Sequence, residues 1–90
     1  MLKIKDNVDL KELEKFDYEL HEDWLNRGYY ENGDVKGKSI YWKHVDLYKS
    51  IEIELDTRKI FESYDDMYRG VEEKYIDDLI NADLVEEVGK

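Results

Sequence analysis

Apolar and polar residues alternate with a period of two over the middle of the chain. Residues 50–55 read SIEIEL, so the isoleucines and the leucine share one face of a strand and the acidic residues share the other. Residues 56–59, DTRK, supply turn chemistry and lead into a second strand over residues 60–63. Residues 39–48, SIYWKHVDLY, alternate in the same way. The pattern predicts consecutive strands here, with a hairpin between the last two.

A helical period precedes these strands. Apolar residues recur on one stripe of a short helix over residues 10–16. Asp9 takes the N-cap position and Glu12 follows three residues later, which is the capping-box pattern. Val8 precedes the cap and is placed to pack on Leu13 as a hydrophobic staple.

The two ends of the chain predict further elements. Residues 2–4, LKI, read as a short first strand. Residues 71–81, VEEKYIDDLIN, have helical spacing and are bracketed by Gly70 and Asn81. Residues 82–88, ADLVEEV, either extend this helix or form a short edge strand.

The segment between the first helix and the strands is harder to interpret. Residues 17–30 predict a strand around Tyr18 and Leu20, followed by a loop. Residues 31–38, ENGDVKGK, concentrate three turn formers and predict a hairpin connection.

Together these elements predict a single α+β domain over residues 1–90. Its small, mostly antiparallel sheet has three to five strands, with two helices packed on one face. Ninety residues suffice for one modest core. The 41% hydrophobic content and ten Tyr or Trp residues distinguish the chain from a disordered acidic tail.

Charge is strongly negative and uneven. Residues 1–45 hold 10 acids and 8 bases (−2), whereas residues 46–90 hold 14 acids and 6 bases (−8). A field of this sign disfavours direct binding to nucleic acid or to an anionic membrane, and it steers the chain toward a basic partner. The absence of cysteine and of any long apolar stretch predicts a cytoplasmic protein without a membrane span.

Patterns for catalysis and cofactor binding are scarce. The two histidines are not spaced as part of a catalytic triad, and HED at residues 21–23 is better explained as a solvated loop than as a metal site. Asp65 and Asp66, with the acidic pair at 72–73, lack the glycine and ligand spacing of a calcium loop. The glycines form no phosphate-binding motif. We therefore expect no enzyme, no metal and no cofactor.

The acidic residues remain to be explained. Glu52, Glu54 and Asp56 would form a row with carboxylates about 6.5 to 7 Å apart, like a line of phosphates. This row is either the solvated face of a soluble protein or a nucleic-acid mimic that contacts Arg and Lys. Aromatic side chains can anchor such an interface. The candidate partner-binding residues are Glu52, Glu54, Asp56, Asp65, Asp66, Asp77, Asp78, Trp24 and Tyr68.

Three blocks of the sequence carry a resemblance. KIKDNVDLKELEKF, IEIELDTRKIF and DDLINADLVEEV resemble segments of small proteins encoded by phages and prophages of low-GC Gram-positive bacteria. Members of that group continue the first helix into an FGF-like turn, whereas this chain has Asp17 in place of the glycine. Small acidic phage proteins include inhibitors of host defence, and anti-CRISPR proteins are similar in size and charge.

The resemblance implies a phage-encoded inhibitor of a bacterial defence system. Such an inhibitor would mimic nucleic acid on the basic face of a nuclease or CRISPR effector, in the cytoplasm of the host cell. The alternative is a phage accessory or regulatory module that uses no mimicry and meets its partner through an aromatic patch. A homodimer that pairs a sheet edge near the C-terminus is a further expectation.

Overall fold

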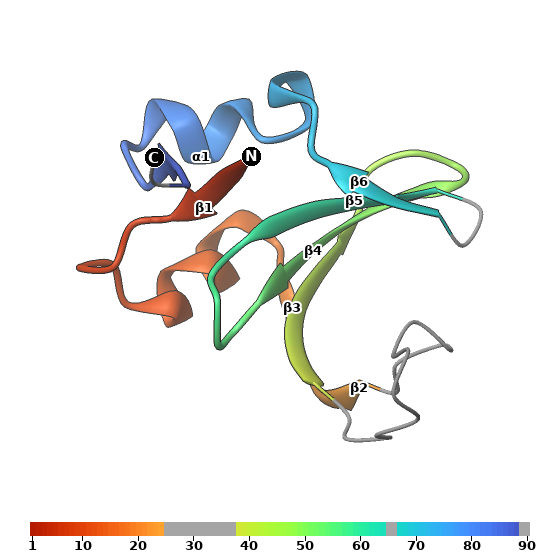
Figure 1. Ribbon diagram of the computed structural model, residues 1–90, viewed down its shortest axis with the longest axis horizontal. Coiled ribbons are helices and arrows are strands. Elements are labelled where there is room, and N and C mark those ends of the chain that lie inside the picture. Colours follow the sequence, from red (N-terminus) through yellow and green to blue (C-terminus); the bar gives the residue numbers. More distant parts are fainter. Residues whose placement is uncertain (25–37, 65–66, 89–90) are drawn as a thin grey trace.

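The computed structural model describes residues 1–24, 38–64 and 67–88, which form two antiparallel sheets and three helical segments (Figure 1). The larger sheet has five strands in sequence order, and each strand pairs with its neighbour. Its strands are β2 (Glu19–Trp24), β3 (Lys38–His44), β4 (Lys49–Glu54), β5 (Ile60–Tyr64) and β6 (Met67–Gly70). The predicted antiparallel sheet is therefore confirmed.

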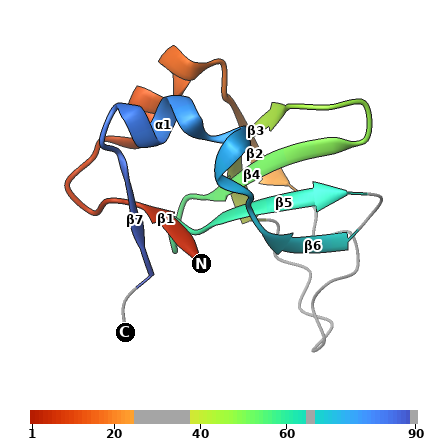
Figure 2. The same cartoon turned by 90° about the horizontal axis from the view of Figure 1, so that it is seen from above.

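The smaller sheet joins the two ends of the chain. Strand β1 (Leu2–Ile4) pairs antiparallel with β7 (Val85–Glu87), beside the larger sheet (Figure 2). The backbone N–H of Ile4 donates to the carbonyl of Arg58 at 2.9 Å, which ties this ribbon to the turn between β4 and β5. The first strand is thus confirmed, and the last segment forms the strand rather than a longer helix.

The first helical segment has its predicted bounds but a different type. It is a 3₁₀ helix, η1 (Leu10–Phe16), whose N-cap Asp9 accepts a hydrogen bond from the N–H of Lys11 at 3.0 Å. Glu12 pairs with Lys15 instead of completing the capping box. Asp17 ends the helix with φ of 70°, so it adopts the left-handed conformation that a glycine would take at this position.

The second predicted helix is broken. Residues 71–81 form a 3₁₀ turn, η2 (Glu73–Tyr75), and a short α-helix, α1 (Asp77–Asn81). Ile76 separates them with φ of −127°, and both Ile76 and Leu79 are completely buried. The packing of two regular helices on one face is therefore not confirmed. Among the described residues, no helix is long and apolar enough to cross a membrane.

The core lies on one face of the larger sheet. Ile53 of β4 lies opposite Tyr41 and Ile60, so all three side chains share that face. The helical segments contribute Leu13, Ile76 and Leu79 to the same cluster. Because α1 is too short to be stable in isolation, its helical conformation depends on this packing.

Two sequence predictions for the strands need correction. The strand predicted over residues 39–48 ends at His44, and the turn that follows leaves Leu47 and Tyr48 exposed by 74% and 68%. Residues 21–23 lie in β2 and not in a loop. Within the segment 17–30, residues 25–30 of the predicted loop lie outside the described residues, as does most of the hairpin connection over 31–38.

Replacing Leu79 by alanine tests whether α1 depends on the core. We expect the free energy of unfolding to fall by about 2–5 kcal/mol, because the substitution leaves a cavity where the side chain is now fully buried. Leu47→Ala is the matched control, with an expected change within about 0.5 kcal/mol because Leu47 is exposed. Urea denaturation measures both, and equal losses would contradict the assignment of the core.

Candidate interaction surface

The predicted solvated row along β4 is not present. Only 4% of Glu52 is exposed, and it lies between Trp42 of β3 and Phe61 of β5 in the register of the sheet. Residues 50–53 of β4 are all buried, so both faces of this strand are covered. The prediction that Glu52 is solvated is therefore wrong, and this residue is not accessible to a partner in the present conformation.

The other two members of the row organise a turn. Glu54 Oε1 accepts a hydrogen bond from the hydroxyl of Thr57 at 2.6 Å, and Asp56 Oδ1 accepts one from the N–H of Thr57 at 2.8 Å. Asp56 follows the end of β4, so it belongs to the turn between β4 and β5 and does not continue the strand. Both carboxylates have local structural partners.

Asp77 and Asp78 begin helix α1, away from that turn (Figure 1). Asp78 accepts a hydrogen bond from the N–H of Leu79 at 2.8 Å and lies 3.4 Å from Lys43 Nζ. Asp77 is exposed. The structure therefore does not join these two acids with Glu54 and Asp56 into one row.

The remaining candidates are described only in part. Trp24 lies in β2 and Tyr68 in β6, which are the two outer strands of the five-stranded sheet, and their side chains are not described. These two residues therefore lie at opposite edges of the sheet. Asp65 and Asp66 lie outside the described residues.

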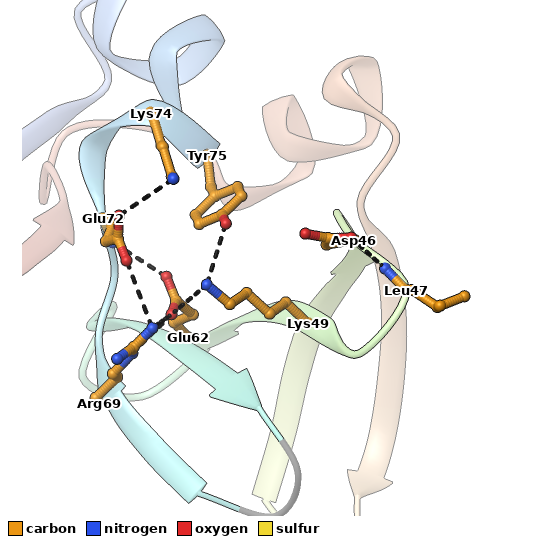
Figure 3. A network of polar contacts seen from close by, with 8 residues as sticks. All are labelled: Asp46, Leu47, Lys49, Glu62, Arg69, Glu72, Lys74 and Tyr75. Carbon is orange, nitrogen blue, oxygen red and sulfur yellow. Dashed lines mark hydrogen bonds and ion pairs between the residues drawn. The ribbon is translucent and has the colours of Figure 1, made fainter.

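One completely buried carboxylate with several polar partners was not singled out from the sequence. Glu62 of β5 is completely buried, and its Oε2 atom accepts a hydrogen bond from Arg69 Nε at 2.7 Å (Figure 3). Its Oε1 atom accepts the backbone N–H of Glu72 at 3.3 Å. Lys49 Nζ lies 3.7 Å from Oε2 and donates to the hydroxyl of Tyr75 at 3.1 Å. The carboxylate thus connects β4, β5, β6 and the start of η2.

The environment of Glu62 favours its charged form. Desolvation raises the pKa of this carboxyl, but the hydrogen bonds from Arg69 and from the N–H of Glu72 lower it, as do the charges of Arg69 and Lys49. The net result is a pKa below the usual 4.5. The sequence contains one indication that Glu62 is buried. It follows Ile60 by two residues in a strand and therefore shares the face of that apolar residue.

Exposed carboxylates concentrate in the C-terminal part of the chain. Residues 71–88 hold 7 acids and 1 base, a net charge of −6. Asp83 pairs with Lys5 at 2.7 Å and Glu86 with Lys3 at 3.6 Å. In the described part of the chain, Glu73 and Asp77 take part in no ion pair, nor do three or more His, Asp or Glu side chains gather to hold a metal ion.

No protein-family model, no curated protein and no solved structure matches this chain.

Replacing Glu62 by glutamine removes the charge and keeps the shape. Because Arg69 is 55% exposed and can be partly hydrated, we expect a loss of only about 1–3 kcal/mol in the free energy of unfolding at neutral pH. The folded pKa of Glu62 is the lower one, so its contribution is fully present above its unfolded pKa near 4.5 and is lost as pH falls through the folded pKa.

Urea unfolding of both proteins over a pH series measures this contribution. The difference between wild type and Glu62→Gln should shrink as the solution becomes more acidic than the unfolded pKa of Glu62. Glu22→Gln, at an exposed position of β2, is the control and should stay within about 0.5 kcal/mol of wild type at neutral pH. A difference that stays constant down to strongly acidic pH would contradict the role assigned to the Glu62 carboxylate.

Proposed function

We propose that this chain is a phage-encoded inhibitor of a bacterial defence system, acting in the cytoplasm of the host cell. Its partner is the basic, nucleic-acid-binding face of a nuclease or CRISPR effector. The observation that carries the proposal is the net charge of −6 over residues 71–88. This segment includes η2, α1 and β7, so its carboxylates are held on ordered elements.

The C-terminal segment replaces the β4 row as the contact surface. Glu73, Asp77 and Glu87 are exposed, and within the described ranges none of them has an ion-pair partner. Such carboxylates can pair with Arg and Lys side chains that otherwise hold phosphates. Glu52, Glu54 and Asp56 contribute to the fold instead, and Asp78 is largely engaged by Lys43.

Inhibition of this kind requires no chemistry on the part of the inhibitor. The overall charge of −10 accelerates the encounter with a basic channel and opposes direct binding to nucleic acid. Bound carboxylates then occupy the cations that the effector uses for its own substrate. A homodimer that pairs a sheet edge near the C-terminus remains a separate prediction from the sequence.

Affinity capture from a bacterial host that expresses the tagged chain tests the proposal. We expect to recover a nuclease or effector that elutes as salt rises from low to moderate concentration, because exposed ion pairs are screened. Nucleic acid added at low salt should displace the same protein, since both ligands would occupy one basic face. Mass spectrometry identifies what is captured.

Two results would contradict mimicry. One is the recovery of no basic nucleic-acid-binding protein. The other is a partner whose binding ignores both salt and nucleic acid.

A second candidate function is favoured by the turn between β3 and β4. Leu47 and Tyr48 are adjacent there and are the two most exposed large apolar side chains in the described part of the chain. Such a pair is typical of a contact with another protein. We propose, as the alternative, a phage accessory or regulatory module that binds its partner through this turn.

The variant Leu47→Ser with Tyr48→Ser separates the two functions. If the turn is the contact, the variant should lose a partner whose binding is insensitive to salt, while the free energy of unfolding changes by only about 1 kcal/mol or less. Capture from the same host measures the binding. Retention of that partner by the double variant would eliminate the alternative.

A further inference from the structure

A groove of about 630 Å³ lies between the start of β1, strand β7 and the segment that leaves β6. Both ribbon views place the start of β1 beside that segment (Figures 1 and 2). Four half-buried apolar residues line the groove, and all of them also pack against the core: Leu2, Val71, Ile80 and Val85. Because the core holds these side chains in place, the apolar lining is already formed without a ligand.

Glutamates form the polar part of the lining. Glu72 and Glu73 come from the start of η2, and Glu86 and Glu87 come from β7. No lysine or arginine lines the groove in the described part of the chain. The carboxylate of Glu72 lies 3.4 Å from Arg69 Nη2 and 3.6 Å from Lys74 Nζ. The carboxylate of Glu86 lies 3.6 Å from Lys3 Nζ.

Two of these glutamates are available to a ligand. Glu73 and Glu87 are exposed, and the described residues supply neither with an ion-pair partner. They lie 14 residues apart in the sequence, on η2 and β7, and the fold brings both to one groove. The groove therefore combines a fixed apolar lining with uncompensated negative charge.

Gly70 provides an independent observation. It lines the groove at the end of β6, its backbone does not adopt the left-handed conformation, and an added Cβ atom would meet nothing within 4 Å. Neither backbone geometry nor packing in the described chain therefore requires glycine there. Glycine in a strand often marks the close approach of a ligand or of another backbone.

We infer that the groove binds a cationic amphipathic segment of a partner protein, with an apolar side chain on the groove lining and flanking Lys or Arg side chains at Glu73 and Glu87. This inference rests on the proposed function and narrows the partner to a peptide segment of stated chemistry. The apolar lining favours an apolar group, and the two glutamates without an ion pair, Glu73 and Glu87, favour cations. A second copy of the chain is a poor occupant, because each copy carries a net charge of −10.

Binding of labelled synthetic peptides to the full chain tests the inference by fluorescence anisotropy. One peptide alternates lysine with leucine, and the control peptide alternates lysine with serine at the same length and charge. We expect the lysine–leucine peptide to bind at low salt with about tenfold higher affinity than the control peptide, because only leucine can use the apolar lining.

Charge-reversal variants locate the site. We expect Glu87→Lys and Glu73→Lys each to lower the affinity for the lysine–leucine peptide by about fivefold or more, because each introduces repulsion at a cation-binding position. Glu22→Lys is the matched control, since Glu22 is also exposed on a strand and has no ion pair within the described ranges. This variant should lower the affinity for the peptide by less than about twofold. Urea unfolding confirms that each variant is folded.

Three results would overturn the inference: no binding of the lysine–leucine peptide at low salt, equal affinity for the two peptides, or equal losses for Glu22→Lys and the groove variants. The outcomes also separate this inference from the proposed function. Peptide binding in the groove without capture of a basic nucleic-acid-binding protein would contradict the function alone. Capture of such a protein, unaffected by Glu73→Lys and Glu87→Lys, would contradict the groove and the contact role of these two glutamates, but not the inhibitory function.

Discussion

The burial of one carboxylate is the constraint on which the rest of this structure depends. Glu62 is inside the protein on the same face as the core isoleucines, where an unpaired charge would be strongly destabilising. Arg69 and Lys49 neutralise it from the two neighbouring strands, and the backbone N–H of Glu72 completes its hydrogen bonds. The last contact holds the chain against the sheet where η2 begins, so that Ile76 can enter the core.

The acidic residues of the chain therefore differ in role according to their position. Glu62 is inside and links four elements, while Glu54 and Asp56 organise a turn through Thr57. Several exposed carboxylates of the C-terminal segment, such as Glu73, lack an ion-pair partner among the described residues, and Glu22 of β2 lacks one too. Net charge alone cannot distinguish these roles, because each depends on the groups that surround the carboxylate in the fold. The interaction surface is consequently smaller than the composition suggests.

Local signals in the sequence were sufficient for several elements. The capping position of Asp9, the alternation of Ile51 and Ile53 and the turn after Glu54 each act within a few residues, and each appears in the structure. The burial of Glu52 was not predictable in this way, because it depends on which residues of β3 and β5 lie opposite it in the register of the sheet. The break at Ile76 was missed for a similar reason: contact with the core overrides the helical spacing of the segment.

The placement of η2 depends on the carboxylate of Glu62. Amide hydrogen exchange in wild type and in Glu62→Gln tests this most directly, because it reports opening residue by residue. In Glu62→Gln, exchange should accelerate at Glu72 and through η2 well beyond the change at Ile51 in the central strand. Equal acceleration at all of these amides, or none at Glu72, would show that Glu62 does not hold this segment and would contradict the account.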